Sequence, residues 1–525
     1  MSGPRVDHDP SERELKLLVK DWRTGRATKT LFEAIQDAYV AVLAVAVIGA
    51  MVVQLIVTVQ STASTCEGVA CVTARSLLPF AVLGAVVALA VGAARLFGPV
   101  LASAAEGFWM LDAPINRASL LRSRLAAAIL LAFVAGAGAG ALVSALTGSA
   151  TTLVVMWAVA TGLSSAGIVA FAAAEQGADR TLFTKIAVYL FSGVSVAALV
   201  IVVGIAAGWW SLDIGVAREE AITLVIAGLG LFVLVLAGVF AVVRLNGIRR
   251  ARLTSGGSLA AGMAGAMYAL DLGLVRDIVV ERNAVERGQV RPRKGRGIGM
   301  DALIRRDLAR VLRTPSVFLP VVVSLVVPYA TVALGAGAFS PLLSALALFG
   351  ALIPLQGMLR VLTRTAGLAR CFPFTGPELR KAAIVVSVGV SVAWGFLATP
   401  AFTSLRESPV DAIPIAMVTA AAGLFGAVRW ITAKPIDFGA PMVATQAGAM
   451  PTGMFTNAVK GFEVVIIITA PMVFGLTWII SAVLAAIVYW FVMGNFDMDA
   501  LREQQEEQRK ELEKARAEKA RQRGR

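Results

Sequence analysis

Histidine is almost absent from this chain of 525 residues: the single one is His8, in a polar N-terminal segment. Its scarcity excludes histidine-based metal sites and catalytic triads. The chain has no Gly-x-x-x-x-Gly-Lys-Ser/Thr loop, so it does not hydrolyse ATP by a P-loop. The glycines of "GRGIGM" (295–300) follow no strand pattern, which argues against dinucleotide binding. We expect no enzyme activity, no metal and no cofactor in this chain.

Charge is also scarce: 16% of the residues are charged and 58% are hydrophobic, with a mean hydropathy of +0.77. Uncharged runs long enough to span a bilayer, roughly 17–25 residues, recur along the whole chain. They lie at 39–60, 77–94, 125–146, 150–174, 186–210, 221–243, 316–336, 341–359, 382–401, 412–428 and 464–493. None contains Asp, Glu, Lys or Arg, which argues against proton coupling, because proton-driven pumps keep such residues in the bilayer.

The last run, 464–493, is too long for one crossing. Thirty helical residues extend about 45 Å, against a hydrocarbon core of about 30 Å. A break near Pro471 or Gly475 would give two crossings and twelve in total. The fold class is therefore an all-α polytopic membrane protein with about twelve transmembrane helices.

The distribution of basic residues sets the orientation. With the N-terminus inside, the outer loops hold only Arg75, Arg218 and Arg406 of the 48 Lys and Arg residues, as the positive-inside rule requires. The polar first 38 residues lack the apolar core of a signal peptide. We expect a multi-pass protein of the bacterial cytoplasmic membrane with both termini cytoplasmic. Its net charge of +14 then faces anionic lipid headgroups, not nucleic acid.

Only three cysteines are present. Cys66 and Cys71 share the first outer loop, "TCEGVAC", and we expect a disulfide there because that side is oxidising. Cys371 lies on the inner side, where an unreactive thiol is expected.

Two halves of the chain follow one plan. Residues 11–22 and 301–315 each combine an apolar face with basic residues, the pattern of an amphipathic interfacial helix, and each precedes a set of six runs. In the second, Asp301 is the predicted cap, and the predicted apolar face is formed by Ile304, Leu308, Val311 and Leu312. A shift of 259 residues aligns "PINRASLLR" (114–122) with "PFTGPELRK" (373–381). Thr375 and Glu378 form a capping-box pattern, and Asn116 is a cap residue at the equivalent place. We therefore predict two parallel six-helix repeats.

The resulting division has five parts. They are a cytoplasmic segment with an amphipathic helix (1–38), the first six-span half (39–243), a cytoplasmic connector (244–300), the second amphipathic helix and six-span half (301–493), and a charged tail (494–525).

These elements together resemble the permeases of type-V-fold ABC exporters, in a doubled, actinobacterial form that acts with a separate ATPase. "WMLDAPINRASLLRSR" is similar to a coupling loop of that family, and "LIRRDLARVLRTP" to its amphipathic elbow helix. The resemblance implies ATPase subunits as partners, ATP bound only by them, and one chain that replaces a permease dimer. It also implies that loops 107–124 and 366–381 contact the ATPases. The implied contact residues are Trp109, Pro114, Asn116, Arg117, Arg122, Pro373, Thr375, Glu378, Arg380 and Lys381.

Two alternatives remain open. A secondary transporter of the major facilitator type also has six plus six spans, although the Gly-x-x-x-Asp-Arg spacing of its basic loop is missing here. A non-transporting scaffold that recruits cytosolic proteins through its tail is the other. Neither the substrate nor the direction of transport follows from the sequence.

Overall fold

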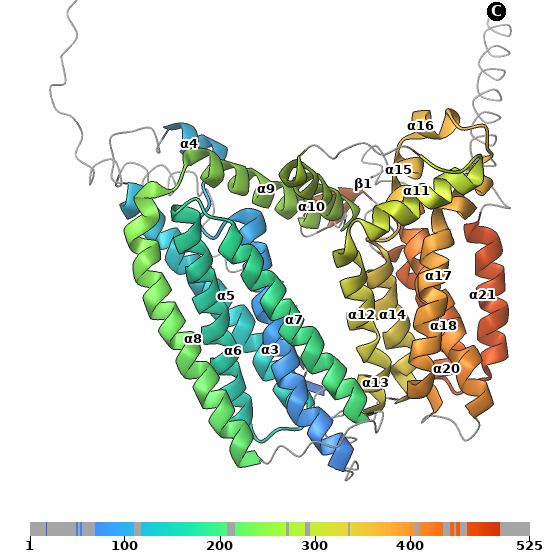
Figure 1. Ribbon diagram of the computed structural model, residues 1–525, viewed down its shortest axis with the longest axis horizontal. Coiled ribbons are helices and arrows are strands. Elements are labelled where there is room, and N and C mark those ends of the chain that lie inside the picture. The colour runs from blue at the N-terminus through green and yellow to red at the C-terminus, as the bar shows by residue number, and fades with distance from the viewer. Residues whose placement is uncertain are drawn as a thin grey trace, which may run out of the picture. The chain divides into compact units, whose positions relative to one another are not determined.

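The structure is a computed structural model that describes residues 17, 49–50, 53–54, 69–109, 117–206, 216–268, 272–288, 295–333, 337–403, 409–433, 442–445, 448–451 and 459–493 (Figure 1). The chain divides into two compact units. The first contains residues 1–198 and 211–261, and the second contains residues 199–210 and 262–525. Almost every described residue lies in a helix or in a short connection between helices.

The helices that begin in the first unit are mostly long and uncharged. Their order is α3 (Val69–Phe97), α4 (Ala104–Trp109), α5 (Arg117–Leu146), α6 (Thr151–Gly177), α7 (Leu182–Ala206), α8 (Val216–Arg244), the 3-10 turn η1 (Leu245–Gly247) and α9 (Arg250–Tyr268).

Helix α6 is the centre of the first unit. It packs against α3, α5 and α8, and 61% of its most apolar window is buried. Glycines make the approach close: a Cβ on Gly140 would lie 2.7 Å from the Thr161 hydroxyl, and one on Gly230 would lie 2.9 Å from the Ser164 backbone nitrogen. Small residues at such crossings let helix backbones pack in a bilayer, where apolar burial alone does not drive association.

The second unit contains more, and shorter, helices. Their order is α10 (Leu272–Arg287), α11 (Met300–Leu312), η2 (Pro315–Phe318), α12 (Leu319–Ser324), α13 (Val326–Ala333), η3 (Gly337–Phe339), α14 (Ser340–Leu352), α15 (Gly357–Arg364), α16 (Ala366–Arg370), α17 (Gly376–Thr403), η4 (Pro409–Asp411), α18 (Ala412–Thr432), α20 (Phe462–Val473) and α21 (Trp478–Val492).

Helix α18 occupies the central place in this unit. It packs against α14, α17, α20 and α21, and 67% of its most apolar window is buried. Gly426 allows the approach of α20, since a Cβ there would lie 2.7 Å from Val465. The most buried span of each unit, α6 or α18, is thus the one that follows α5 or α17, the helix into which the predicted loop runs.

The structure confirms most of the predicted spans. Eight helices among the described residues are long and apolar enough to cross a membrane, and a ninth candidate is the pair α14–α15, bent by 67°. The bend falls inside the predicted run 341–359, where Pro354 and Gly357 interrupt the helix. The predicted run 39–60 lies almost wholly outside the described residues.

The run 464–493 is broken, as predicted, and Gly475 marks the place. Gly475 has φ +77°, whereas Pro471 stays inside α20. The two resulting helices have 12 and 15 residues, about 18 and 22 Å at 1.5 Å per residue. Each is therefore shorter than a full crossing of about 30 Å, so the described helices do not supply twelve complete spans.

The lack of charge holds for the predicted runs but not for the full helices. Helix α8 begins at Val216, which places Glu219 in its first turns, and this side chain is buried. The indole nitrogen of Trp157 in α6 donates to Glu219 Oε1 at 3.1 Å.

Helix α11 is the predicted amphipathic helix at 301–315, with two differences. Gly299, with φ +64°, precedes the helix in place of the predicted Asp301 cap, and Asp301 instead pairs with Arg305 at 2.7 Å. The buried stripe contains Leu303 and Val311. Leu308 and Leu312, predicted on the apolar face, are exposed. Of the amphipathic helix expected at 11–22, Leu17 alone lies within the described residues.

A two-stranded antiparallel hairpin is the exception to the all-helical expectation. Strands β1 (Met442–Thr445) and β2 (Gly448–Pro451) pair Met442 with Pro451 and Thr445 with Gly448.

Candidate functional site: the corners between the second and third predicted spans

The corner of the first unit connects α3 to α5 through α4. Helix α3 ends at Phe97, and Gly98 turns the chain with φ +88°. The Gln176 side chain of α6 then holds the next turn: it accepts from the Val100 N–H at 3.3 Å and donates to the Val100 carbonyl at 3.2 Å. Both backbone groups of this buried turn are thereby satisfied, as buried polar groups must be.

Helix α4 is fixed at both its start and its side. Ser103 and Glu106 form a capping box, with the Ser103 N–H donating to Glu106 Oε2 at 2.9 Å and the Glu106 N–H to Ser103 Oγ at 3.2 Å. Arg124 of α5 then donates to Glu106 Oε1 and to the Leu101 carbonyl, each at 2.5 Å. Burial alone raises the pKa of Glu106, but the hydrogen bonds from Arg124 and Ser103 outweigh it and lower the pKa from 4.5 to about 2.

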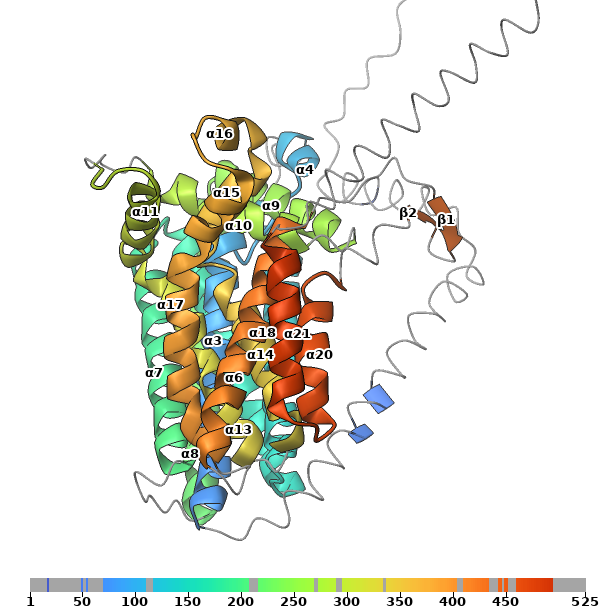
Figure 2. The ribbon, with the colours of Figure 1, turned by 90° about the vertical axis from the view of Figure 1, so that its right-hand side faces the viewer.

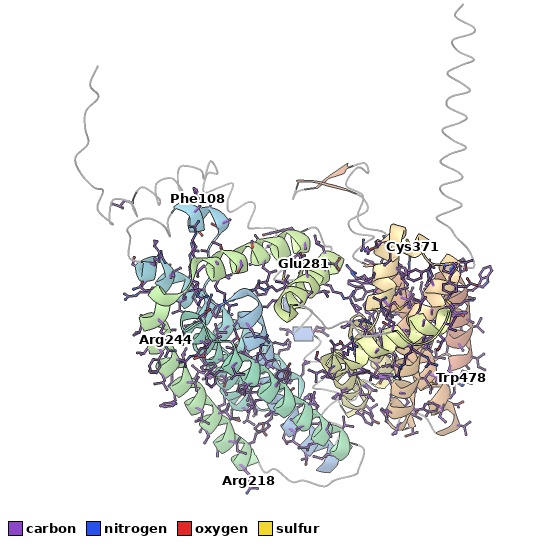
Figure 3. The ribbon with its side chains drawn as sticks, turned by 45° about the horizontal axis from the view of Figure 1, so that its top comes forward. Phe108, Arg218, Arg244, Glu281, Cys371 and Trp478 are labelled. Carbon is purple, nitrogen blue, oxygen red and sulfur yellow. The ribbon has the colours of Figure 1, made fainter. Side chains whose placement is uncertain are left out.

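Helix α9 lies against this corner, at the same end of the bundle as α4 (Figure 1). A Cβ on Gly256 would collide with the Phe97 carbonyl oxygen, and one on Gly257 with the Ala102 carbonyl oxygen. The Ala102 N–H donates to the Leu253 carbonyl at 3.1 Å. Phe108, labelled in Figure 3, has the guanidinium of Arg250 5.9 Å from its ring centre, within the range of a cation–π contact.

The start of α5 is capped by a residue that sequence reasoning missed. The Ala118 N–H donates to Asn246 Oδ1 of η1 at 2.9 Å. The predicted cap Asn116 and Pro114 lie outside the described residues. Arg117 begins α5, Arg122 is exposed, and Trp109 ends α4.

The corner of the second unit is built around the bend between α14 and α15. Arg310 of α11 donates to Asp307 Oδ1 at 2.9 Å and to the Leu355 carbonyl in the bend at 2.5 Å. Arg360 of α15 forms an ion pair with Asp277 of α10 and donates to the Gly273 carbonyl at 2.9 Å. Helices α10 and α11 thus hold this corner, whereas Glu106 holds the first from within its own loop.

The loop before α17 contains the second set of predicted contact residues. The Thr375 N–H donates to Glu378 Oε2 at 2.8 Å, and the Thr375 carbonyl accepts from the Leu379 N–H at 3.0 Å. One of the two bonds of the predicted capping box is therefore present. Arg380 donates to the Val492 carbonyl at the end of α21, at 2.9 Å, while Pro373, Glu378 and Lys381 are exposed.

Both loops lie at an end of their own helix bundle. In Figure 2, α15 and α16 lie beyond the end of α17, beside α11. The nearby Cys371, labelled in Figure 3, is a free, exposed thiol. Of the predicted disulfide, Cys71 lies in the first turns of α3 and Cys66 lies outside the described residues.

In the part of the chain that the structure describes, no group of three or more His, Cys, Asp or Glu side chains is placed to hold a metal ion. The corners offer exposed basic and apolar side chains on short helices that are fixed to long ones. Such an arrangement can bind a partner through the exposed side chains and can pass a displacement of the short helices on to the long ones.

The fold defines this chain as a helical, polytopic membrane protein. It belongs to a family of unknown function, DUF6297, which residues 71–441 match. Neither the curated proteins nor the solved structures contain a match to it.

Proposed function

We propose that this chain is the transmembrane permease of an ATP-driven exporter, coupled to separate ATPase subunits through loops 107–124 and 366–381. ATP is bound by the partner, and the chain itself contributes the path across the membrane. In this proposal the protein is a multi-pass protein of the bacterial cytoplasmic membrane, with both loops and both termini on the cytoplasmic side.

The observation that carries the proposal is the fixed attachment of each loop to a long helix. A displacement applied to α4 passes to α5 through the Glu106–Arg124 pair and through the Arg124 bond to the Leu101 carbonyl. In the second loop, the Thr375–Glu378 cap and the Arg380 bond to Val492 join the start of α17 to α21. A rigid, capped helix start transmits a rigid-body push, while a flexible loop absorbs it.

The agreement between the two units supports the proposed six-plus-six repeat. Helices α5 and α17 begin at residues 117 and 376, so the difference, 376 − 117 = 259, equals the shift that aligns the two loop motifs. A short helix precedes each of them, and the most buried span follows each of them. In the proposal, one chain holds both halves of a pseudo-dimer, with α20 and α21 as the short last pair.

Charge reversal on the exposed faces of the two loops tests the proposal. The full-length chain is purified in mild detergent with its cell's ATPases, under conditions that trap ATP. We expect ATPase subunits, two per chain, to co-purify with the natural protein and to be lost with Arg122→Glu combined with Lys381→Glu.

Arg305→Glu combined with Arg306→Glu on α11 is the matched control, because both side chains are exposed and lie outside both loops. It changes the surface charge by the same −4 as the double loop variant and should leave the ATPases bound. Absence of any ATPase from the natural protein under trapping conditions would contradict the proposal.

One observation favours the secondary transporter as the second candidate. Glu219 is a buried carboxyl group in the first turns of α8, where it accepts from Trp157 of α6, and a carboxyl group buried against a membrane span is expensive and is kept mainly for function. Glu219→Gln keeps an acceptor for the Trp157 indole but cannot exchange a proton. Loss of proton-driven transport in liposomes without ATPase subunits would favour this candidate, whereas unchanged ATP-driven export would exclude it.

A further inference from the structure

A polar cluster surrounds the bend between α14 and α15 in the second unit, and the function proposed above does not use it. It is formed by side chains from the connector helix α10, from α11 and from the bend itself. Its members are Arg276, Asp277, Asp307, Arg310, Gln356 and Arg360.

Two of the three arginines are fully engaged by the protein. Arg310 bonds Asp307 and the Leu355 carbonyl, and Arg360 bonds Asp277 and the Gly273 carbonyl. Each of these guanidinium groups therefore has one carboxylate and one backbone carbonyl. These two arginines are therefore held in place by the protein itself, whereas other polar atoms of the cluster have no partner.

Polar atoms of Arg276 and Gln356 are buried and have no hydrogen-bond partner. Nη1 of Arg276 is inaccessible to solvent and makes no hydrogen bond, and neither does the amide nitrogen or the amide oxygen of Gln356, whose side chain is 0% exposed. Burying an unpaired donor costs about 1–3 kcal/mol, and more for a charged one. Oδ2 of Asp307 is a fourth buried atom of the cluster without a partner. Gln356 lies in the bend, and Arg276 lies near enough to Arg310 and Arg360 for their charges to lower its pKa. Four buried polar atoms without partners in one cluster indicate a place for a polar ligand.

The charge of the cluster indicates the sign of that ligand. Three guanidinium groups and two carboxylates give 3 − 2 = +1. Burial, and then the charges of Arg360 and Arg310, lower the pKa of Arg276 to about 10 despite the opposing effect of Asp277. Burial also raises the pKa of Asp307, against the opposing effect of Arg310.

We propose that Arg276 and Gln356 bind a phosphate group at the bend between α14 and α15. The Arg276 guanidinium and the Gln356 amide nitrogen donate to phosphate oxygens, the geometry for which arginine is best suited. The Gln356 amide oxygen accepts from a hydroxyl, which both hydrogen phosphate and a hydroxylated phospholipid headgroup carry. The bound group ties the connector helix α10 to the bend. This inference does not depend on the exporter proposal.

The test uses the full-length, delipidated protein in detergent. Its thermal midpoint is measured against increasing inorganic phosphate, and its bound lipid is counted by native mass spectrometry after addition of phosphatidylglycerol or of zwitterionic phosphatidylcholine. A response to phosphate alone identifies a free anion as the ligand, and retention of phosphatidylglycerol over phosphatidylcholine identifies an anionic headgroup. Either response must weaken about tenfold or more in Arg276→Gln, the loss of one charge-assisted hydrogen bond.

Two further variants keep the test decisive. Arg305→Gln removes an exposed arginine from α11 and must respond like the natural protein. Gln356→Leu removes the amide with little change of volume and must weaken binding even if Arg276→Gln does not fold. In anion-free buffer Arg276→Gln should be at least as stable as the natural protein, because it removes a buried charge that lies beside Arg360 and Arg310 and whose Nη1 has no partner. The proposal is overturned if the natural protein responds to neither probe, or if the folded cluster variants respond as it does.

Discussion

The two corners occupy the same place in the chain but are held in different ways. In the first unit the carboxylate that fixes α4 belongs to the loop itself, and Gln176, Asn246 and α9 complete the support. In the second unit the helix before the loop is bent, and arginines attach it to α10 and α11. The first corner is held by a carboxylate of its own loop together with η1 and α9 at the start of the connector, whereas the second depends on α10, further along the connector, and on α11.

This difference has a mechanical consequence. The position of α4 follows α5 through one short ion pair, so it is fixed relative to its own span. The position of α15 follows α10, because Arg360 is bonded to Asp277 and Gly273. A displacement of α10 therefore reaches the second corner directly. Substitutions that remove the contacts of one corner should leave the other corner unchanged.

The largest expected effect is steric and lies at the first corner. Gly256→Val places side-chain atoms against the Phe97 carbonyl oxygen, and we expect about 3 kcal/mol of destabilisation, the upper part of the range for overpacking, because backbone must move. Gly265→Val is the matched control on the same helix, where a Cβ meets nothing within 4 Å. The control should change stability by less than about 0.5 kcal/mol. Equal thermal midpoints for the two variants in detergent would mean that α9 does not pack on this corner.

The next effect isolates the second corner. Arg360→Met keeps the aliphatic stem but removes the partner of Asp277 and the donor to Gly273. Removing one member of a fully buried pair costs about 3–5 kcal/mol. Asp277 is 47% exposed and can be rehydrated, so we expect about 2 kcal/mol. Limited proteolysis within α10 should accelerate in this variant and not in Gly256→Val, which acts on α9; the reverse pattern would contradict the assignment of α10 to the second corner.

The pH dependence of the free energy of unfolding should report on Glu106, and therefore on the first corner alone. The folded pKa of Glu106, about 2, lies below its ordinary value of 4.5. Its ionised form is therefore favoured by folding: the contribution is complete above about pH 4.5 and is lost as the pH falls toward 2. Glu106→Gln should lose about 1–2 kcal/mol at neutral pH. Between pH 4.5 and 2, its free energy of unfolding should fall less steeply with decreasing pH than that of the natural protein. Equal slopes for the two proteins would mean that the Glu106–Arg124 pair does not stabilise the first corner.

The long elements were predictable because a single property decides them. An uncharged run of some twenty residues has few alternatives to a span. The length of the run 464–493 predicts a break, and the structure selects Gly475 over Pro471 as its place. The Thr375–Glu378 cap was predictable because its partners are three residues apart. Asn246 and Gln176 act on residues 128 and 76 positions away, and no local pattern indicates such partners.

Two patterns in the sequence indicate the close packing of α9 and the bend between α14 and α15. The pair Gly256–Gly257 interrupts an otherwise helical connector, and adjacent glycines inside a helix often mark a close backbone approach. Pro354 and Gly357 inside the run 341–359 indicate a bend. Arg360 and Asp277 remained hidden because the sequence does not show that a connector helix packs on the second corner.

The smallest effect compares the two caps directly. Ser103→Ala removes a hydroxyl that donates to Glu106 Oε2 at 2.9 Å and accepts from the Glu106 N–H at 3.2 Å. Thr375→Ala removes a hydroxyl that bonds only the Glu378 carboxylate, and the Thr375 N–H keeps its own bond to that group. We expect about 1 kcal/mol for Ser103→Ala and about 0.5 kcal/mol for Thr375→Ala.

Ser103→Thr and Thr375→Ser are the controls, since each keeps a hydroxyl and should restore most of the loss in chemical denaturation. A corner held by a carboxylate of its own loop concentrates its stability in such local bonds, whereas a corner held from outside is insensitive to them. A larger loss for Thr375→Ala than for Ser103→Ala would reverse that conclusion, because the second corner would then rest on its own cap more than on α10 and α11.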